Sequence, residues 1–309
     1  MNWQVFVKQR VSVLKHHFGD LLDRADDYWT IIPNKERFSF IADFKIANLD
    51  EVKILTINKN QKNEHWQQIF DCPNLEELTL HDPSKEQIQS IQKLVKIKRI
   101  RITFFRTNDI KFLADLINLE EVILEYVSGF SDLKPLQKLT KLKSLHLENL
   151  RRVTNFDGLK GIKNLRYLYI DGTLDWKQPI ENFSFLEELP NLEIIAFGFI
   201  INKTEYPAFL PILKLKKLKK IRIGMATLDT KEYAFLQTAL PDVMCGSFSD
   251  TTWTACYQIN ENYMEFIGKG AGNVKLNNPK AGEKIEAFKK QYEMDKKKAK
   301  EIIKNCNDK

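Results

Sequence analysis

The chain contains little cysteine and lacks long apolar runs. Its 309 residues include four cysteines, and no two of them form a C-x-x-C pair. This pattern indicates neither a zinc knuckle nor a disulfide-clamped secreted cap. No stretch approaches the roughly 18 to 20 apolar residues of a membrane span, and residues 1–20 lack the apolar core of a secretory signal. We therefore expect free, mostly buried thiols and a cytoplasmic protein that crosses no membrane.

Motifs for catalysis or metal binding are also missing. The five histidines show no H-E-x-x-H spacing, and no motif places a base and an orienting acid around a Ser or Cys nucleophile. The segment "GKGAGNVK", residues 268–275, is rich in glycine but lacks the Lys-Ser/Thr ending of a phosphate-binding loop. We interpret it as a tight turn, with a nucleotide-binding or enzymatic role as the alternative. The sequence predicts no enzyme, no metal and no cofactor.

The positive charge of the chain is concentrated at one end. The net charge is +7, and residues 280–309 hold ten Lys against six acidic residues. A second basic stretch, "LKLKKLKKIR", covers residues 213–222. Nucleic-acid binding through this Lys-rich third is an alternative, but aromatic side chains are sparse there. A solvated charged face is the interpretation we prefer.

An apolar residue followed by others three and five positions later recurs along most of the chain. The triplets are Val52-Leu55-Ile57, Leu75-Leu78-Leu80, Ile97-Ile100-Ile102, Leu119-Val122-Leu124, Leu142-Leu145-Leu147, Leu165-Leu168-Ile170, Leu192-Ile195-Phe197, Leu218-Ile221-Ile223 and, more weakly, Leu240-Val243-Cys245. Their first members lie 23, 22, 22, 23, 23, 27, 26 and 22 residues apart. Chance apolar clustering has no reason to keep such a period, so the chain is built of repeats.

The pattern resembles L-x-x-L-x-L-x-x-N of the leucine-rich repeat family, in the short form of about 22 residues that bacterial internalins have. The resemblance implies an α/β fold, a right-handed solenoid (horseshoe) with short parallel strands on its concave face. Step-of-three runs such as Leu133-Leu136-Leu139 then form helical or 3-10 returns on the convex face. No repeat buries its own apolar face, so both ends need non-repeat caps. We expect an N-terminal helical cap at 1–48, about nine repeats at 49–248 and a C-terminal cap at 249–309.

Two features depart from the family pattern. The ninth repeat position, where the family has an Asn that bonds to neighbouring backbones, keeps this residue only at Asn60. The other repeats have Pro83, Phe105, Val127, Leu150, Thr173, Ile200 and Ala226. We therefore expect looser, less uniform turns. The two long repeats have extra residues within 171–185 and 201–211, which we expect to form bulged loops.

Both ends of the chain are predicted to form caps over the ends of the repeat stack. Residues 3–23 place apolar side chains on one helical face, and residues 37–44 alternate as an edge strand does. At the other end, residues 248–276 predict one or two strands and a turn. An amphipathic helix follows, with a seam of Ile285, Phe288, Tyr292, Ala299, Ile302 and Cys306. We prefer packing of this helix on the last repeats; partner binding or a coiled-coil contact is the alternative.

The family resemblance also implies which side chains form the concave face, because residues between the inward leucines point outward. Acidic and tyrosine side chains gather there on adjacent strands, which favours a cationic protein or peptide as partner. The predicted partner-binding residues are Glu121, Glu125, Tyr126, His146, Glu148, Tyr167, Tyr169 and Asp171. The alternative is that Arg99, Arg101 and Arg166 neutralise the acids internally. We expect a non-enzymatic protein-binding module that binds neither nucleic acid nor membranes.

Overall fold

The computed structural model describes residues 40–42, 45–58, 65–246 and 253–307. These residues form two compact units: one comprises the described residues up to 153 together with 164–167, and the other comprises 154–163 together with the described residues from 168 onwards. The predicted helix of the N-terminal cap, residues 3–23, lies outside the described residues. That part of the domain division stays a prediction.

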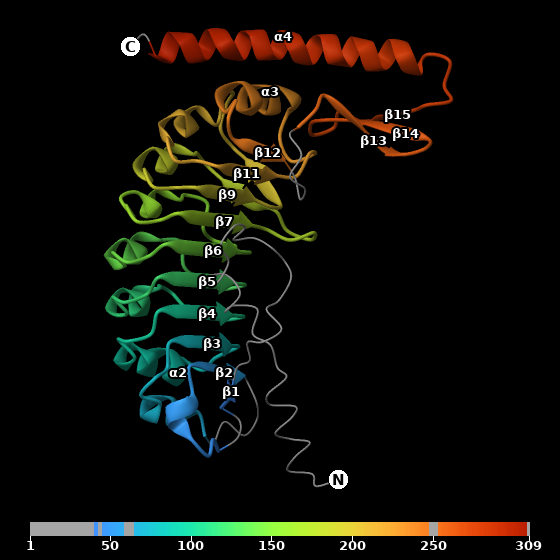
Figure 1. Cartoon of the computed structure of the whole chain (residues 1–309). Coiled ribbons are helices and arrows are strands. Elements are labelled where there is room, and N and C mark those ends of the chain that lie inside the picture. Colours follow the sequence, from blue (N-terminus) through green and yellow to red (C-terminus); the bar gives the residue numbers. More distant parts are fainter. Residues whose placement is uncertain (1–39, 43–44, 59–64, 247–252, 308–309) are drawn as a thin grey trace. The chain divides into compact units, whose positions relative to one another are not determined.

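The first unit is built on parallel strands that follow one another in chain order. The strands are β1 (Phe40–Ile41), β2 (Ile54–Asn58), β3 (Glu77–His81), β4 (Arg99–Thr103), β5 (Glu121–Glu125) and β6 (Ser144–Glu148). From β2 to β6 the pairing is in register, so Leu55, Leu78, Ile100, Val122 and Leu145 lie opposite one another. These strands lie side by side in Figure 1. The predicted step of two within each triplet is confirmed as a strand.

The returns between these strands are short helices, which stack along one side of the strands in Figure 1. They are η2 (Leu49–Glu51), η3 (Trp66–Asp71), α2 (Lys85–Ser90), η4 (Ile91–Lys93), η5 (Lys111–Asp115) and η6 (Lys134–Lys138). Ser84 and Gln87 form a capping box that fixes the start of α2. The inward side chains of strands and returns, such as Leu136 and Leu145, are 0% exposed. This continuous apolar stack is the core of the unit.

The second unit continues the same design. Its parallel strands are β7 (Tyr167–Asp171), β9 (Ile194–Phe197), β11 (Lys220–Ile223) and β12 (Met244–Gly246), with returns η7 (Asp157–Leu159), η8 (Ser184–Glu188) and η9 (Leu210–Lys214). The extra residues of the long repeats do not form only bulged loops. Instead β8 (Gln178–Ile180) and β10 (Ile200–Asn202) pair as a separate parallel sheet. The prediction of loops is wrong there because two adjacent insertions satisfy each other's backbone groups.

The return before β12 is the longer helix α3 (Thr230–Ala239), which lies within the predicted repeats. The predicted C-terminal cap, whose bounds stay a prediction, contains the antiparallel strands β13 (Cys256–Asn260), β14 (Tyr263–Phe266) and β15 (Asn273–Lys275), and α4 (Ala281–Asn307). The helix α4 packs against α3, where the Tyr292 hydroxyl donates to Gln237 Oε1 at 3.1 Å. The Phe288 ring stacks on Phe266 at 4.5 Å. The preferred interpretation, packing within the chain, is confirmed for α4 (Figure 1).

An asparagine ladder is present, at a different position from the family's. An Asn directly before the first leucine of a triplet donates its side-chain amide to a backbone carbonyl of the preceding repeat. The bonds run from Asn74 to Asp50 at 2.8 Å, from Asn118 to Val95 at 2.7 Å, from Asn164 to Thr140 at 2.6 Å and from Asn191 to Lys163 at 2.7 Å. Lys141 and Lys217 extend the ladder by donating to Asn118 and Asn191. Convex-side carbonyls are therefore satisfied without the family's Asn at position nine.

The sequence predicts free, mostly buried thiols and no segment that crosses a membrane. All four cysteines are free thiols, and Cys72 and Cys245 are buried. Burial raises the pKa of the Cys245 thiol to about 12. Among the described residues, no helix combines the length and the apolar character that crossing a membrane requires.

The stacked core predicts that truncating an inward leucine destabilises the fold, whereas truncating an exposed leucine does not. Leu145 on β6 is 0% exposed, whereas Leu174 is 82% exposed. We expect Leu145→Ala to lower the free energy of unfolding by about 2 to 5 kcal/mol, because it removes buried methyl groups and leaves a cavity. Leu174→Ala is the control and should stay within about 0.5 kcal/mol of wild type. Urea denaturation followed by circular dichroism measures both, and equal effects would contradict this assignment of the core.

One carboxyl group of the second unit, that of Glu232, is buried with a raised pKa. Glu232, on α3, is 2% exposed, and its Oε1 accepts a hydrogen bond from the Ala208 backbone N–H at 3.0 Å. Desolvation by burial raises the pKa of this carboxyl to about 7, from an ordinary value of 4.5. The folded chain therefore retains this proton over a pH range in which the unfolded chain has lost it.

This raised pKa makes stability depend on pH with a definite sign. The stabilising contribution is fully present below about pH 4.5 and is lost as the pH rises to about 7. We expect a loss of roughly 3 kcal/mol over this window, which Glu232→Gln should abolish because an amide does not titrate. The measurement is the difference in unfolding free energy between variant and wild type at pH 4.5, 6 and 8. Glu261→Gln, at an exposed position, is the control and should give a difference independent of pH.

Candidate functional site: the outward face of strands β3 to β6

Polar side chains of β4, β5 and β6 make the outward face of the first unit. Arg101 donates from Nε and from its terminal nitrogen to Oε2 of Glu125, at 2.9 and 2.5 Å. On the neighbouring pair of strands, His81 Nδ1 and Thr103 Oγ1 lie 2.8 Å apart in a hydrogen bond. In-register pairing places these groups side by side, since equivalent repeat positions meet across the sheet. The face is thus organised before any partner binds.

Three titratable groups converge on this face. Ligand atoms of Glu125, His146 and Glu148 all lie within 4.8 Å of one another. His146 Nε2 lies 3.4 Å from Glu148 Oε2. A carboxylate and imidazole set of this kind is chemically able to hold a cation. The Arg101 guanidinium, however, already neutralises Glu125, so an organic cation that shares Glu148 suits the face better than a metal ion does.

The turn after each of these strands has the same backbone conformation. Asp82, Phe104, Tyr126 and Asn149 have φ values of +49°, +55°, +55° and +54°. The N–H groups of the first three donate to Thr103, Glu125 and Glu148 carbonyls, at 2.8, 3.0 and 2.9 Å. The prediction of looser, less uniform turns is therefore wrong for these repeats. Their backbone groups are satisfied by the next strand, and the apolar ninth residues, such as Phe105 and Val127, pack in the core.

A row of aromatic rings follows from these turns. The His81 ring meets Phe104 edge to face at 5.3 Å, and Phe104 stacks on Tyr126 at 4.8 Å with an angle of 20° between the rings. Phe104 is 51% exposed and Tyr126 37% exposed. Bulky residues rarely adopt positive φ, and such strain concentrates at functional sites. An exposed aromatic pair in a strained conformation is therefore the strongest sign of a binding site in this unit.

Phe104 is a residue that sequence reasoning missed. The sequence prediction considered the third, fifth and seventh repeat positions, together with Tyr126, whereas Phe104 occupies the eighth position of its repeat. A signal was present, because Phe104 and Tyr126 lie 22 residues apart and thus at equivalent positions of adjacent repeats. What the sequence does not reveal is the positive φ that directs both rings outward.

Not every predicted site residue reaches the surface. Glu121 is 0% exposed, so a partner does not contact it directly. The third repeat position is buried in the neighbouring strands as well, at Glu77 and Ser144. The alternative prediction holds for Arg101, which pairs with Glu125. Arg99 pairs instead with Glu77, an acid outside the predicted set. Tyr126, His146 and Glu148 remain together on the outward face of the first unit, with Glu125, only 9% exposed, beneath them in its pair with Arg101.

The remaining predicted residues have local partners. The Arg166 guanidinium lies 5.1 Å from the centre of the Tyr167 ring. In the second unit, Tyr169 donates its hydroxyl to Asp171. Asp171 is 8% exposed, and its other oxygen accepts from the Phe199 backbone N–H at 2.6 Å. A Cβ on Gly198 would lie 1.8 Å from the Asp171 carboxylate, so this glycine makes room for the carboxylate. Asp171 therefore serves the fold before it serves a partner.

The repeat period, the in-register parallel strands and the helical returns define the class. The chain has the α/β leucine-rich repeat fold, and the resemblance seen in the sequence is confirmed at the level of the fold.

No family model and no curated protein matches the chain. Similar solved structures include internalin C2 from Listeria monocytogenes, at 21% identity and a TM-score of 0.37 over 50% of this chain and 65% of that one. Internalin F from the same organism is 17% identical, with a TM-score of 0.41 over 75% of this chain and 71% of that one. A leucine-rich repeat protein from Leptospira interrogans is 17% identical, with a TM-score of 0.40 over 66% of this chain and 56% of that one. The chain thus spans slightly less than two thirds of internalin C2.

The left-handed turn at Phe104 predicts that a glycine substitution there changes the stability of the fold very little. At Phe104, glycine relieves the left-handed backbone but removes the ring stack on Tyr126, and these effects nearly cancel. We expect Phe104→Gly to change the free energy of unfolding by less than about 1 kcal/mol. The matched control is Phe105→Ala at the neighbouring buried position, which should cost about 3 to 5 kcal/mol. Urea denaturation compares them; a larger loss at Phe104 would mean that its ring is structural.

Proposed function

We propose that this chain is a non-enzymatic protein-binding module, and that the outward face of β3 to β6 binds a basic peptide segment of a partner protein. The observation that carries the proposal is the exposed, stacked pair of Phe104 and Tyr126 in strained turns. Both rings are rigid, with few rotatable bonds to immobilise, which favours aromatic side chains as anchors of interfaces.

The charges around the rings support a cationic partner. The Phe104 and Tyr126 backbone N–H groups donate to the backbone carbonyls of Glu125 and Glu148, so each ring follows a strand whose neighbour ends in an acidic residue. Glu148 keeps part of its side chain accessible, and His146 Nε2 lies 3.4 Å from its Oε2. A Lys or Arg side chain can lie on an aromatic face and reach a carboxylate at the same time. We therefore propose alternating basic and apolar residues in the bound segment.

The alternatives have less support. Gly268, Gly270 and Gly272 have φ values of +127°, +71° and +78°, which is the conformation that a turn requires. A Cβ on Gly268 would lie 2.1 Å from Thr230, so the loop is packed against the start of α3. This arrangement explains the glycines without a nucleotide.

Nucleic-acid binding through residues 213–222 also has less support. Lys219 pairs with Glu193 at 2.8 Å, and Lys217 donates to Asn191. These bonds between repeats give the lysines a role on the surface of the fold.

A cytoplasmic location remains part of our proposal, supported by the four free cysteines.

Binding kinetics test the proposed face. For a partner captured from cytosol, we expect Glu148→Lys to slow association severalfold at low salt and less at high salt, because exposed charges act through steering. Tyr126→Ala should instead speed dissociation, with a loss on the order of 2 kcal/mol or more if the ring is an anchor. Biolayer interferometry at two ionic strengths separates the two rates.

Lys217→Glu, in the basic stretch of the second unit, is the control and should bind like wild type. If this variant loses binding while the Glu148 and Tyr126 variants keep it, the partner uses the basic stretch, and the proposed face is wrong. Circular dichroism of every variant checks that the repeats stay folded.

A further inference from the structure

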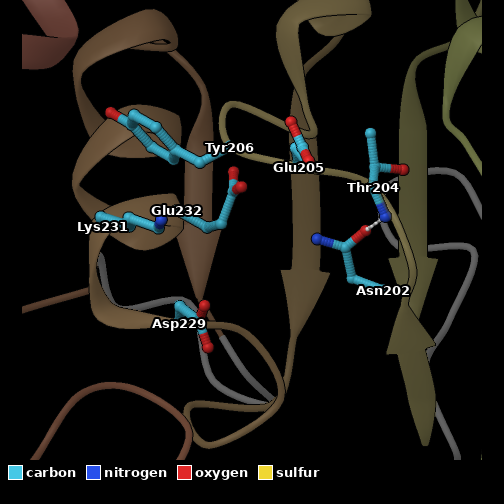
Figure 2. A pocket seen from close by; sticks show the side chains of 7 residues that line it. All are labelled: Asn202, Thr204, Glu205, Tyr206, Asp229, Lys231 and Glu232. Carbon is cyan, nitrogen blue, oxygen red and sulfur yellow. Dashed lines mark hydrogen bonds between the residues drawn. The ribbon is translucent and has the colours of Figure 1, made fainter.

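The second unit contains a pocket that the proposed function does not use. It has a volume of about 410 Å³ and lies between the segment after β10 and the start of α3. Figure 2 shows Asn202 and Thr204 on one side, Asp229, Lys231 and Glu232 on the other, the Tyr206 ring beside Lys231, and Glu205 between the two groups. Polar and charged side chains thus line the pocket.

The most unusual group in the pocket is the Glu232 carboxylate. Oε1 accepts from Ala208 N–H, which ties α3 to the segment before η9. Oε2 is buried and has no hydrogen-bond partner among the described residues. Leaving a carboxylate oxygen unpaired away from water costs folding free energy, so such an atom commonly marks a place for a ligand. Because Glu232 lines the pocket, an occupant that displaces the side chains covering this oxygen would supply the partner that it lacks.

The balance of charge favours a cation. Glu205, Asp229 and Glu232 contribute three carboxyl groups, against the single ammonium of Lys231. The Lys231 Nζ lies 4.9 Å from the centre of the Tyr206 ring, so one face of that ring already accommodates an ammonium group. The side-chain oxygen Oδ1 of Asn202 accepts from Thr204 N–H at 2.8 Å (Figure 2). An amide oxygen has two lone pairs, so this bond leaves Oδ1 one further position for a donor.

We propose that this pocket binds a primary ammonium group, with Glu232 Oε2 as its main acceptor and Asp229 and Glu205 as supporting charges.

The geometry separates this ligand from other cations. Among the described residues, Glu125, His146 and Glu148 are the group of three such side chains whose ligand atoms lie within 4.8 Å of one another, so the three acids of the pocket do not converge as a metal-ligand triad. A guanidinium prefers two oxygens of one carboxylate, but Oε1 of Glu232 is already bonded to the backbone. A single free oxygen suits the compact ammonium.

Burial couples this binding to protonation. Desolvation raises the pKa of Glu232 to about 7. The hydrogen bond from Ala208 N–H and the charge of Lys231 lower it, the charge of Asp229 raises it, and the nearby Phe209 N–H, which makes no hydrogen bond of good geometry with Glu232, lowers it least. On the neighbouring segment Tyr206 is uncharged at this pH, since burial and the charges of Glu232 and Asp295 raise its pKa to about 12. An ammonium favours the ionised carboxylate, so its binding lowers the pKa of Glu232. By linkage, affinity falls as the pH drops below about 7.

The test uses the full chain and 1,5-diaminopentane as probe. Isothermal titration calorimetry at pH 8 and pH 5.5 measures affinity, and the ¹³Cδ shift of Glu232 followed against pH measures its titration midpoint. We expect binding at pH 8, about tenfold weaker binding at pH 5.5, and a lower midpoint in the presence of the diamine. The uncharged 1-pentanol should not bind.

Variants assign the effect to the pocket. Glu232→Gln keeps an oxygen for the Ala208 N–H but loses the charge, so it should weaken diamine binding about tenfold or more. Asp229→Asn should weaken it by a smaller factor, and it breaks no cap because the Asp229 side chain makes no capping hydrogen bond. Glu261→Gln, at an exposed position of the same unit, is the control and should bind like wild type.

Three outcomes would overturn the proposal: no binding of the diamine at millimolar concentration, equal binding by 1-pentanol, or unchanged affinity in Glu232→Gln. A midpoint that shifts with Mg²⁺ and not with the diamine would also overturn it, in favour of a metal ion. Nα-acetyl-lysine methylamide identifies the source of the ammonium group. Tighter binding of this compound than of the diamine supports a lysine side chain of a protein, and the reverse order supports a free amine.

Discussion

The in-register stacking of parallel strands is the constraint on which the other features of each unit depend. In the first unit, Leu55, Leu78, Ile100, Val122 and Leu145 face one another across β2 to β6. No repeat closes its own core, so each needs the apolar surface of the next. A slip by one residue would turn these side chains outward, because side chains alternate along a strand. The same register fixes where the turns, the asparagines and the outward charges lie.

Stacking leaves polar backbone at every turn, and the chain satisfies it in two ways. Asparagines before the triplets bond to carbonyls of the preceding repeat, and N–H groups of left-handed turn residues bond to the following strand. Asp82 and Asn149 suit this conformation because their short side chains tolerate positive φ. Phe104 and Tyr126 occupy the same position without that advantage. A residue that conflicts with its local backbone is expected where function selects it.

The buried acids of the chain differ in how many hydrogen-bond and ion-pair partners offset the cost of burying them. An acid with enough partners serves the fold, whereas one that lacks a partner is a candidate for ligand binding. Glu125 has the Arg101 guanidinium, and Asp171 has a tyrosine hydroxyl and a backbone N–H. Glu232 has one backbone N–H, and its second oxygen stays unpaired among the described residues. Desolvation then dominates, which is why its pKa rises toward neutrality. Such a group responds to a ligand far more strongly than a compensated one does.

The sequence by itself determined the repeat, the strands, the inward leucines and the amphipathic C-terminal helix, because these depend on periods within one or two repeats. It also placed Tyr126, His146 and Glu148 on one face. Only the tertiary structure decided that Glu121 is buried, that Phe104 points outward, that β8 pairs with β10 and that Glu232 lines a pocket. Each of these outcomes depends on what a neighbouring repeat supplies as partner or covering surface, and the spacing of residues along one repeat carries no information about that.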